Sequence, residues 1–210
     1  MEGMRRDYDG SPLVEADAGD DPIAFFHRWF EEASAIDPYM TNAMTLATAD
    51  ADAGPDARIV LLKGIDPSGG FRWFTSRASA KGAQLAAQPR AALLFHWPAL
   101  DRQVRLRGAV EDLPSAAVDT YFHQRPRVSQ IAAACAVQGS LLPDRSTLHR
   151  AYDDLAKELG DTAVPVPDHW VGYRLLPVAI EFWQGQPGRL HDRLLYRRGV
   201  RGWTRQRLAP

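Results

Sequence analysis

The chain of 210 residues contains one cysteine, Cys135, and only three lysines among its 25 lysine and arginine residues. A single cysteine excludes an intrachain disulfide and a metal cage built from cysteines. The six histidines show no metal-ligand spacing, so we expect no metal site. No apolar run approaches the roughly 20 residues of a membrane span, and the N-terminus lacks the apolar region of a signal peptide. We therefore expect a cytoplasmic protein with no membrane partner.

The formal net charge of −1 argues against a nucleic-acid partner, because nucleic-acid-binding domains are usually strongly basic. The content of 45% hydrophobic and 24% charged residues is ordinary for a globular protein with a sizeable core. Residues 1–20 are polar and rich in Gly and Asp, so we expect a mobile segment that precedes a single domain at 21–210.

Alternation and turn signals predict a mainly β protein of the α+β class. The expected strands are Met44–Ala49, Arg58–Ile65, Phe71–Thr75, Ala91–Trp97, Val104–Glu111, Trp170–Leu176, Ala179–Gln184, Leu194–Arg198 and Gly202–Leu208. The expected helices are Pro22–Ala35, Ala78–Gln88, Ser115–His123 and Thr147–Leu159, the first capped by Asp21 and the third by Ser115. Many short strands with few helices favour a barrel-like core with helices outside it.

The last quarter of the chain combines aromatic and basic side chains. An apolar strand that carries Trp183 runs into a Gly/Pro turn, which is followed by Arg189, His191 and Arg193. Alternation along an extended segment would place these three side chains on one face. Such a group suits an anionic, planar ligand, although a solvated basic edge strand has the same pattern.

Three earlier segments carry cations, and the second and third of them suggest phosphate binding. Arg58 and Lys63 flank an apolar strand, on opposite faces of it, and residues 74–81 bring hydroxyls and cations to a helix N-terminus, where backbone N–H groups favour an anion. Taken alone, this second segment is better explained by Ser79 acting as an ordinary helix cap. Tyr121 and Arg125 stand four residues apart and would share a helix face with Ser129, although Pro126 can interrupt such a helix.

Four ordered motifs together resemble the FMN-dependent pyridoxine/pyridoxamine 5′-phosphate oxidases over nearly the whole chain. They are Arg-Ile-Val-Leu-Leu-Lys (58–63), Tyr-Phe-His-Gln-Arg-Pro-Arg-Val-Ser-Gln (121–130), Glu-Phe-Trp-Gln-Gly (181–185) and Arg-Leu-His-Asp-Arg (189–193). The resemblance implies an FMN-binding split β-barrel with peripheral helices. It also implies a homodimer with FMN at the subunit interface and a vitamin B6 phosphate as the small-molecule substrate.

The resemblance further implies roles for individual residues. FMN contacts fall on Arg58, Ile59, Val60, Leu61, Leu62, Lys63, Phe74, Thr75, Lys81, Gln103, Gln138, Trp183 and Arg193. Substrate contacts fall on Arg5, Tyr8, Lys63, Tyr121, Arg125, Ser129, Arg189 and His191, of which Arg189 and His191 would act in catalysis by orienting the pyridine ring. Arg5 and Tyr8 belong to the N-terminal segment, which would close as a lid over the bound substrate.

The implied reaction is oxidation of pyridoxamine or pyridoxine 5′-phosphate to pyridoxal 5′-phosphate, with hydride passing to FMN and oxygen reduced to hydrogen peroxide. Two departures from the family pattern concern the cofactor. Ala80 stands where the family has Arg, and Gly139 where it has Ser, which predicts weaker FMN retention unless Arg77 replaces the missing cation. The alternatives are a related flavin oxidase of the phenazine type and a non-catalytic flavin or pyridoxal-phosphate carrier.

Overall fold

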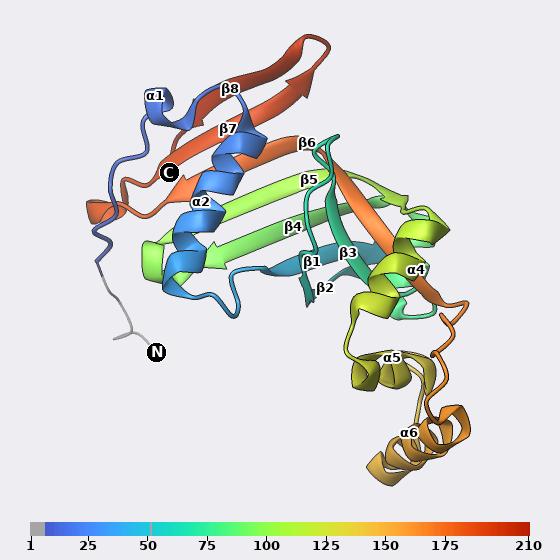
Figure 1. The fold of residues 1–210 in the computed structure, drawn as a ribbon. Helices are drawn as coiled ribbons and strands as arrows, with labels where there is room; N and C mark the ends of the chain where they lie inside the picture. Colours follow the sequence, from blue (N-terminus) through green and yellow to red (C-terminus); the bar gives the residue numbers. More distant parts are fainter. Residues whose placement is uncertain (1–6, 51) are drawn as a thin grey trace.

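A single antiparallel sheet of eight strands forms the centre of the protein (Figure 1). The computed structural model describes residues 7–50 and 52–210. The strands are β1 (Ala43–Asp50), β2 (Gly54–Leu61), β3 (Phe71–Ser76), β4 (Arg90–Trp97), β5 (Arg102–Asp112), β6 (Trp170–Gln184), β7 (Asp192–Gly199) and β8 (Gly202–Leu208). They pair in the order β2-β1-β4-β5-β6-β7-β8, and β3 pairs with β6 beside this path. The expected fold class is therefore confirmed.

Strand β6 departs from the expectation of two separate strands. It runs without interruption from Trp170 to Gln184, pairs with β3 through Trp170–Leu175, and pairs with β7 through Ala179–Gln184. The sequence around Pro177 reads as a break because proline cannot donate to a ladder. The ladder with β5 instead absorbs it at a register shift between Arg107 and Gly108. A Cβ added to Gly108 would come within 2.0 Å of the Leu176 carbonyl oxygen, so this close approach requires glycine.

Most of the expected boundaries agree with the structure within a few residues. The helices are α1 (Glu15–Ala18), α2 (Pro22–Ile36), α3 (Ala80–Ala87), α4 (Ser115–Gln124), α5 (Arg127–Ala134) and α6 (Arg145–Leu159), with 3-10 turns η1 (Pro98–Leu100) and η2 (Pro187–Arg189). Strand β2 begins and ends earlier than expected, which leaves Lys63 beyond its end. Helix α4, which begins at Ser115, is preceded by Pro114 and has no side-chain cap, so the capping role expected of Ser115 was wrong.

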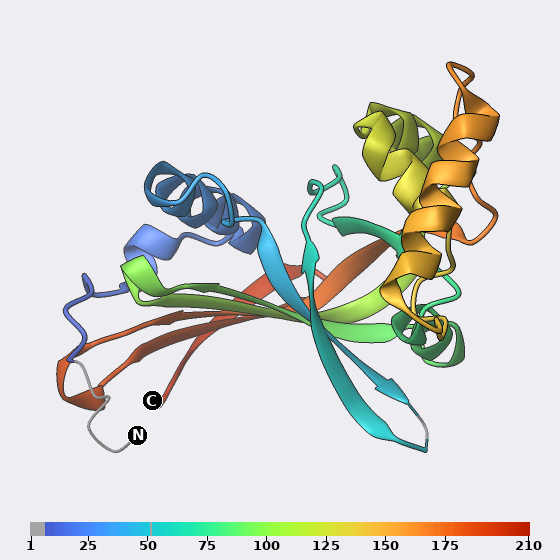
Figure 2. The same ribbon diagram turned by 90° about the horizontal axis from the view of Figure 1, so that it is seen from below.

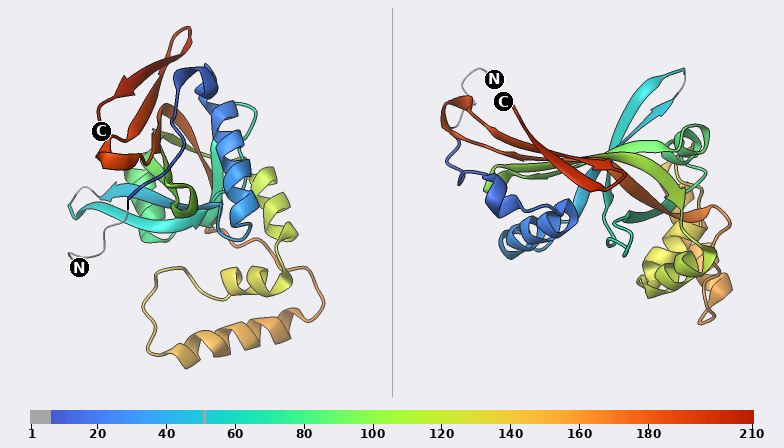
Figure 3. Two further views of the ribbon diagram at one scale, coloured as in Figure 1. Left: turned by 90° about the vertical axis from the view of Figure 1, so that its left-hand side faces the viewer. Right: turned by 90° about the horizontal axis from the view of Figure 1, so that it is seen from above.

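Helix α2 covers the part of the sheet that holds most of the core (Figure 2). Asp21 caps it as predicted, since its carboxylate accepts from the Ile23 N–H at 2.9 Å. Phe25, Phe26 and Trp29 are buried against the sheet. Helices α4, α5 and α6 lie at the other end of the sheet, around a smaller apolar cluster (Figure 3). No helix in the described part of the chain has both the length and the apolar character needed to cross a membrane.

The N-terminal segment from residue 7 onward lies against the C-terminal hairpin, and it contains a short helix, α1, that the sequence did not predict. Leu13 is buried, and its N–H donates to Asp192 at 3.0 Å. Glu15 and Arg207 form an ion pair at 2.8 Å, and hydrogen bonding from Arg207 is the main cause that lowers the pKa of Glu15 to about 2. These contacts place residues 13–15 firmly on the fold, while the role of the segment as a lid stays a prediction.

Candidate cofactor and substrate site

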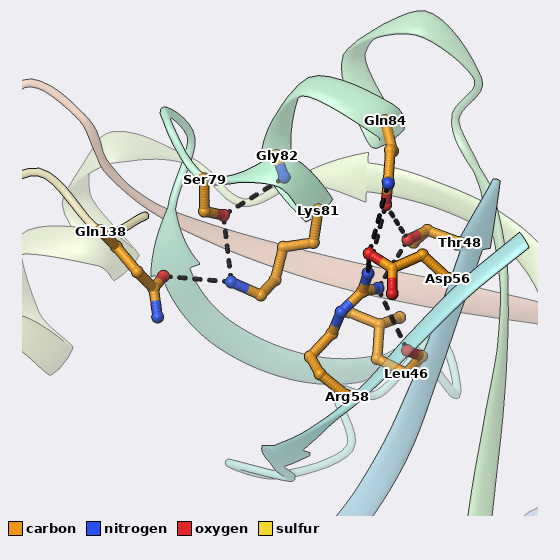
Figure 4. Close-up of polar contacts among 9 residues, drawn as sticks. All are labelled: Leu46, Thr48, Asp56, Arg58, Ser79, Lys81, Gly82, Gln84 and Gln138. Atoms are coloured by element: carbon orange, nitrogen blue, oxygen red, sulfur yellow. Dashed lines mark hydrogen bonds and ion pairs between the residues drawn. The ribbon is translucent and has the colours of Figure 1, made fainter. Parts of the chain in front are cut away.

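Lys81 is a buried cation that forms no ion pair with a carboxylate in the described part of the chain. It lies in the first turn of α3, and 8% of its surface is exposed. Its ammonium donates to Ser79 Oγ at 3.0 Å and to Gln138 Oε1 at 3.1 Å (Figure 4), and Thr75 Oγ1 donates to the same Gln138 oxygen at 3.1 Å. Burial, then the nearby charge of Arg58, lowers the pKa of Lys81. The structure thus brings together three predicted FMN contacts, Thr75, Lys81 and Gln138, at a helix N-terminus that Ser79 caps as expected.

Arg58 extends from β2 towards α3 and is held by four neighbours. Its guanidinium donates to the Leu46 carbonyl at 3.2 Å, to Thr48 Oγ1 at 2.6 Å and to Gln84 Oε1 at 3.3 Å, and it forms an ion pair with Asp56. Arg58 and Lys81 extend into the same region between β2 and α3 (Figure 4), and the charge of Arg58 contributes to the lowered pKa of Lys81 while Asp56 opposes it. Two neighbouring cations beside neutral oxygens are suited to a phosphate group.

The apolar residues of the 58–63 segment differ in how far their side chains are exposed. Val60 packs against the core and Leu62 is buried, whereas Ile59 and Leu61 are 60% and 40% exposed. Strand β2 is an edge strand of the described sheet, so one side of its backbone is free for hydrogen bonding. The backbone of Leu62 is already used, because its N–H donates to the Asn42 carbonyl oxygen and its own carbonyl oxygen accepts from the Asn42 side chain, so Ile59 and Leu61 are the more accessible members of the segment.

A cavity of about 440 Å³ lies next to Lys81 and contains both cofactor and substrate candidates. Phe74, Thr75, Arg125 and Gln138 line it, together with Trp170. The guanidinium of Arg125 lies 4.3 Å from the centre of the Trp170 ring, and its Nη1 is buried without a hydrogen-bond partner. An unpaired buried donor of this kind is costly unless a ligand accepts from it.

Tyr121 and Arg125 do not share a helix face, which corrects the expectation from their spacing. Helix α4 ends at Gln124, Arg125 is extended (φ −72°, ψ 150°), and Ser129 belongs to the separate helix α5. The cause is Pro126, which disfavours helical geometry in the residue before it. Tyr121 nevertheless remains beside the cavity, because its ring stacks on Phe74 with a centroid distance of 3.8 Å.

A second group of predicted residues lies where β6 meets β7. Tyr8, Trp183 and His191 contact one another through their rings, with centroids 4.7–5.6 Å apart, and the Arg189 guanidinium lies 5.5 Å from the Tyr8 ring. The Gln186 N–H donates to His191 Nδ1 at 3.1 Å, so the neutral imidazole carries its proton on Nε2. Burial, then the charge of Arg189, lowers the pKa of His191, which favours this neutral form. We call Tyr8, Trp183, Arg189 and His191 the ring cluster.

Arg189, His191 and Arg193 do not lie on one face of a strand, contrary to the expectation. Gly188 and Arg189 have φ of 64° and 65°, and β7 begins only at Asp192, so the alternation of an extended chain does not apply. Arg193 instead donates to Glu181 Oε1 at 2.9 Å and to the Ala209 carbonyl at 2.9 Å. Glu181 is buried and also pairs with Arg105. The sequence analysis missed this carboxylate, although it is the first residue of the Glu-Phe-Trp motif.

Four predicted residues make no side-chain hydrogen bond within either group or lie outside the described residues, although Gln103 is the cross-strand partner of Trp183 in the ladder between β5 and β6. The side chains of Lys63, Gln103 and Ser129 make no hydrogen bond or ion pair with residues 7–50 or 52–210, and Arg5 is outside these ranges. No three His, Cys, Asp or Glu residues in the described ranges are arranged to hold a metal ion.

The two departures at Ala80 and Gly139 also have a structural context. Arg77 forms an ion pair with Asp112 at 2.8 Å, on the exposed side of the sheet, so it does not replace the missing cation at position 80 in this arrangement. Gly139 has φ of 89°, a conformation that favours glycine over serine.

The site residues fall into two groups at opposite ends of β6. Trp170 lies beside the cavity and Trp183 lies in the ring cluster, 13 positions further along one strand. At about 3.3 Å per residue such a strand spans up to roughly 40 Å, which is too far for one small ligand. Figure 1 shows the same separation, with α4–α6 at one end of the molecule and the turn between β6 and β7 at the other.

The sheet topology is that of the split-barrel flavin-binding proteins. A solved structure with the same fold is PhzG from Burkholderia lata 383, determined in complex with tetrahydrophenazine-1-carboxylic acid. It is 28% identical, with a TM-score of 0.88 over 96% of this chain and 99% of that chain. A pyridoxamine 5′-phosphate oxidase-related, FMN-binding protein from Nostoc punctiforme shares the fold at 17% identity, with a TM-score of 0.70 over 88% of this chain and 97% of that one.

The chain belongs to the pyridoxine/pyridoxamine 5′-phosphate oxidase family, a family of oxidoreductases. Residues 35–157 match the family model described as pyridoxamine 5′-phosphate oxidase, and residues 170–210 match the pyridoxine 5′-phosphate oxidase C-terminal dimerisation region. Relatives named pyridoxine/pyridoxamine 5′-phosphate oxidase from Ralstonia pickettii and Pseudomonas paraeruginosa are 51% and 49% identical. Each alignment covers 99% of this chain and 97% of the relative. The expected family is therefore confirmed.

Proposed function

We propose that the protein binds FMN between two copies of the chain and oxidises pyridoxamine and pyridoxine 5′-phosphates to pyridoxal 5′-phosphate, with oxygen reduced to hydrogen peroxide. The single observation that carries the proposal is the buried Lys81 ammonium, which has only neutral oxygens as partners and lies near Arg58. The names of relatives about 50% identical over the whole chain support the same reaction.

The FMN phosphate is the group that suits these cations. Burying an ammonium beside another cation costs free energy unless an anion compensates it. A phosphate that accepts hydrogen bonds from Lys81, Arg58 and Thr75 would supply that charge and would lie at the N-terminus of α3. The apolar cavity wall beside it, which includes Phe74, would then face the rest of the cofactor.

The separation of the two groups along β6 supports an interface site. A ligand held by Lys81 of one copy can reach a ring cluster only if the second copy contributes it, because the two groups of one chain are too far apart. The match of residues 170–210 to a dimerisation region is consistent with this arrangement, since that range contains Trp183, His191 and Arg193. We infer a homodimer with two such composite sites.

Arg125 is the residue proposed to bind the substrate phosphate. Arg125 lines the cavity, its Nη1 is buried without a hydrogen-bond partner, and the faces of Trp170 and Phe122 lie against its guanidinium. Burial lowers the pKa of Arg125, yet an arginine remains charged at any physiological pH. The Tyr121 hydroxyl on the neighbouring helix turn would provide a second donor, and Lys63 and Ser129 would join them only if the bound state rearranges.

His191 is proposed to orient the substrate as a hydrogen-bond donor. Because Nδ1 accepts from the Gln186 N–H, only Nε2–H is available to a ligand, and a proton donor in this state cannot also serve as a general base. Tyr8 packs edge-on against the His191 ring and the Arg189 guanidinium lies over the Tyr8 ring, so both residues would help to restrict the substrate's pyridine ring. When bound, FMN supplies the hydride acceptor for the reaction, so the side chains mainly need to bind and orient.

The proposal is tested by mixing FMN-loaded protein with pyridoxine 5′-phosphate or pyridoxamine 5′-phosphate in the absence of oxygen and following the flavin absorbance. We expect the flavin band to bleach, pyridoxal 5′-phosphate to form, and colour with one equivalent of hydrogen peroxide to return when oxygen is admitted. Arg125→Met should bleach only at much higher substrate concentration, because it lacks the proposed phosphate contact.

A second candidate is oxidation of a phenazine precursor, which the similarity to PhzG favours. Flavin that is reduced by tetrahydrophenazine-1-carboxylic acid but by neither B6 phosphate would replace the proposed substrate with this one. Flavin that is bound and reduced by none of these compounds would favour a non-catalytic carrier, and a protein that binds no FMN would contradict both oxidase proposals.

A further inference from the structure

Gln84 is a buried polar residue in the middle of α3 whose whole side chain is used in hydrogen bonds. It is 7% exposed and faces Thr48, which is 4% exposed, across the contact between α3 and β1. Its Oε1 accepts from Thr48 Oγ1 and from Arg58, and its Nε2 donates to Asp56 at 3.4 Å (Figure 4). Polar side chains buried to this degree carry a desolvation cost that their hydrogen bonds must offset.

The direction of these bonds is fixed by Arg58. A guanidinium only donates, so Thr48 Oγ1 accepts from Arg58 and must give its own proton to Gln84 Oε1. The amide of Gln84 is thereby oriented with its oxygen towards Arg58 and its NH₂ towards Asp56. Gln84 thus makes hydrogen bonds with both the Thr48 hydroxyl and the Asp56 carboxylate, the two groups that also contact the Arg58 guanidinium.

The hydrogen bonds around Arg58 also counteract its electrostatic repulsion from Lys81. Arg58 lies near the buried ammonium of Lys81, and like charges favour separation. Arginine is long and flexible, and without a fixed set of acceptors its guanidinium would turn towards solvent, away from Lys81. Only Asp56 among its side-chain acceptors is substantially exposed, whereas Thr48 and Gln84 are inside the protein.

We propose that Gln84, acting with Thr48, is a positioning residue that holds Arg58 ready for the phosphate of the cofactor. This inference rests on the proposed function, in which Arg58 and Lys81 bind the FMN phosphate. Gln84 itself does not touch the cofactor; it reduces the ordering of Arg58 that binding would otherwise require. Its effect should therefore be specific to ligands that carry the phosphate and should vanish when Arg58 is absent.

The test compares FMN and riboflavin, which lacks the phosphate, by quenching of flavin fluorescence in titrations of flavin-free full-length protein. Gln84→Met keeps the length and helix propensity of the side chain but removes its hydrogen bonds. We expect its Kd for FMN to rise about ten-fold, on the scale of immobilising one long side chain, and its Kd for riboflavin to change less than about two-fold. Gln88→Met, the same change at an exposed position at the end of α3, should alter neither value.

A double-mutant cycle separates positioning from a general structural role. In an Arg58→Met background, Gln84→Met should weaken FMN binding less than about two-fold, since the residue it acts through is gone. Thr48→Val should weaken FMN binding in the same phosphate-specific way, so the test does not depend on the folding of one variant.

The possible results distinguish this inference from the proposed function. Equal losses for FMN and riboflavin, or equal losses with and without Arg58, would overturn the positioning role. Wild-type protein that binds FMN while Gln84→Met leaves its Kd unchanged would overturn this inference alone. Wild-type protein that binds no FMN would overturn the proposed function as well.

Discussion

Replacing Lys81 with Met tests whether the buried ammonium exists for a ligand or for the fold. In the FMN-free protein the substitution removes two hydrogen bonds, to Ser79 Oγ and Gln138 Oε1. Neither oxygen is orphaned, because Ser79 Oγ also donates to the Ser76 carbonyl at 2.7 Å and Gln138 Oε1 also accepts from Thr75. The substitution also removes the desolvation cost of a buried charge and its repulsion with a neighbouring cation.

The two effects of Lys81→Met should have opposite signs. The free energy of unfolding of the FMN-free protein should stay unchanged or rise by about 1 kcal/mol, because desolvation of an ammonium costs more than bonds to neutral acceptors return. The affinity for FMN should fall by about 10- to 100-fold, since a charge-assisted hydrogen bond contributes about 1.5–3 kcal/mol. Urea unfolding and a fluorescence titration measure the two quantities on the same protein.

Lys157→Met, at an exposed position of α6, is the matched control and should change neither quantity appreciably. The reasoning is refuted if Lys81→Met unfolds at markedly lower urea concentration and binds FMN as the wild type does. That pattern would assign Lys81 a purely structural role and would remove the main support for the phosphate site.

The remaining predictions concern the KM for the substrate, the contribution of Arg193 to FMN binding, and the pH dependence of kcat/KM. Arg125→Met should raise the KM for pyridoxine 5′-phosphate by ten-fold or more with a smaller change in kcat, because it removes a phosphate contact outside the reacting atoms; equal KM values in steady-state assays would rule this role out. Glu181→Gln should release one of the two groups that hold Arg193 and weaken FMN binding several-fold, and an unchanged Kd would show that the Ala209 carbonyl suffices. Burial, then the charge of Arg189, lowers the pKa of His191, so the neutral form predominates at neutral pH and is lost as the pH falls through the lowered pKa. Protonation of Nδ1 would break the hydrogen bond from the Gln186 N–H that orients the ring, so kcat/KM should decline over that acid range in the wild type. A pH profile of His191→Asn with the same decline would assign it to another group.

The local sequence was sufficient for most of the strands, although not for the continuity of β6 or the bounds of β2, and for the first long helix and the family. Alternation along β1, β4, β5 and β8 is a property of neighbouring residues, and the Asp21-Pro22 start of α2 depends only on a side chain and the next turn. The motifs in the chain likewise identified Arg58, Lys81, Arg125 and His191 as candidates without any contact being known.

Only the tertiary structure decided how those candidates are grouped. Pro177 is tolerated inside β6 because a partner strand shifts its register there, and this one long strand is what separates the cavity from the ring cluster. In the sequence, Gln84 resembles any polar residue of a helix. Only the packing of α3 on β1 brings its side chain into hydrogen-bond contact with Thr48 and Arg58. Pairing between strands and packing between elements involve residues far apart in the chain, and no local pattern records which distant side chain will be the neighbour.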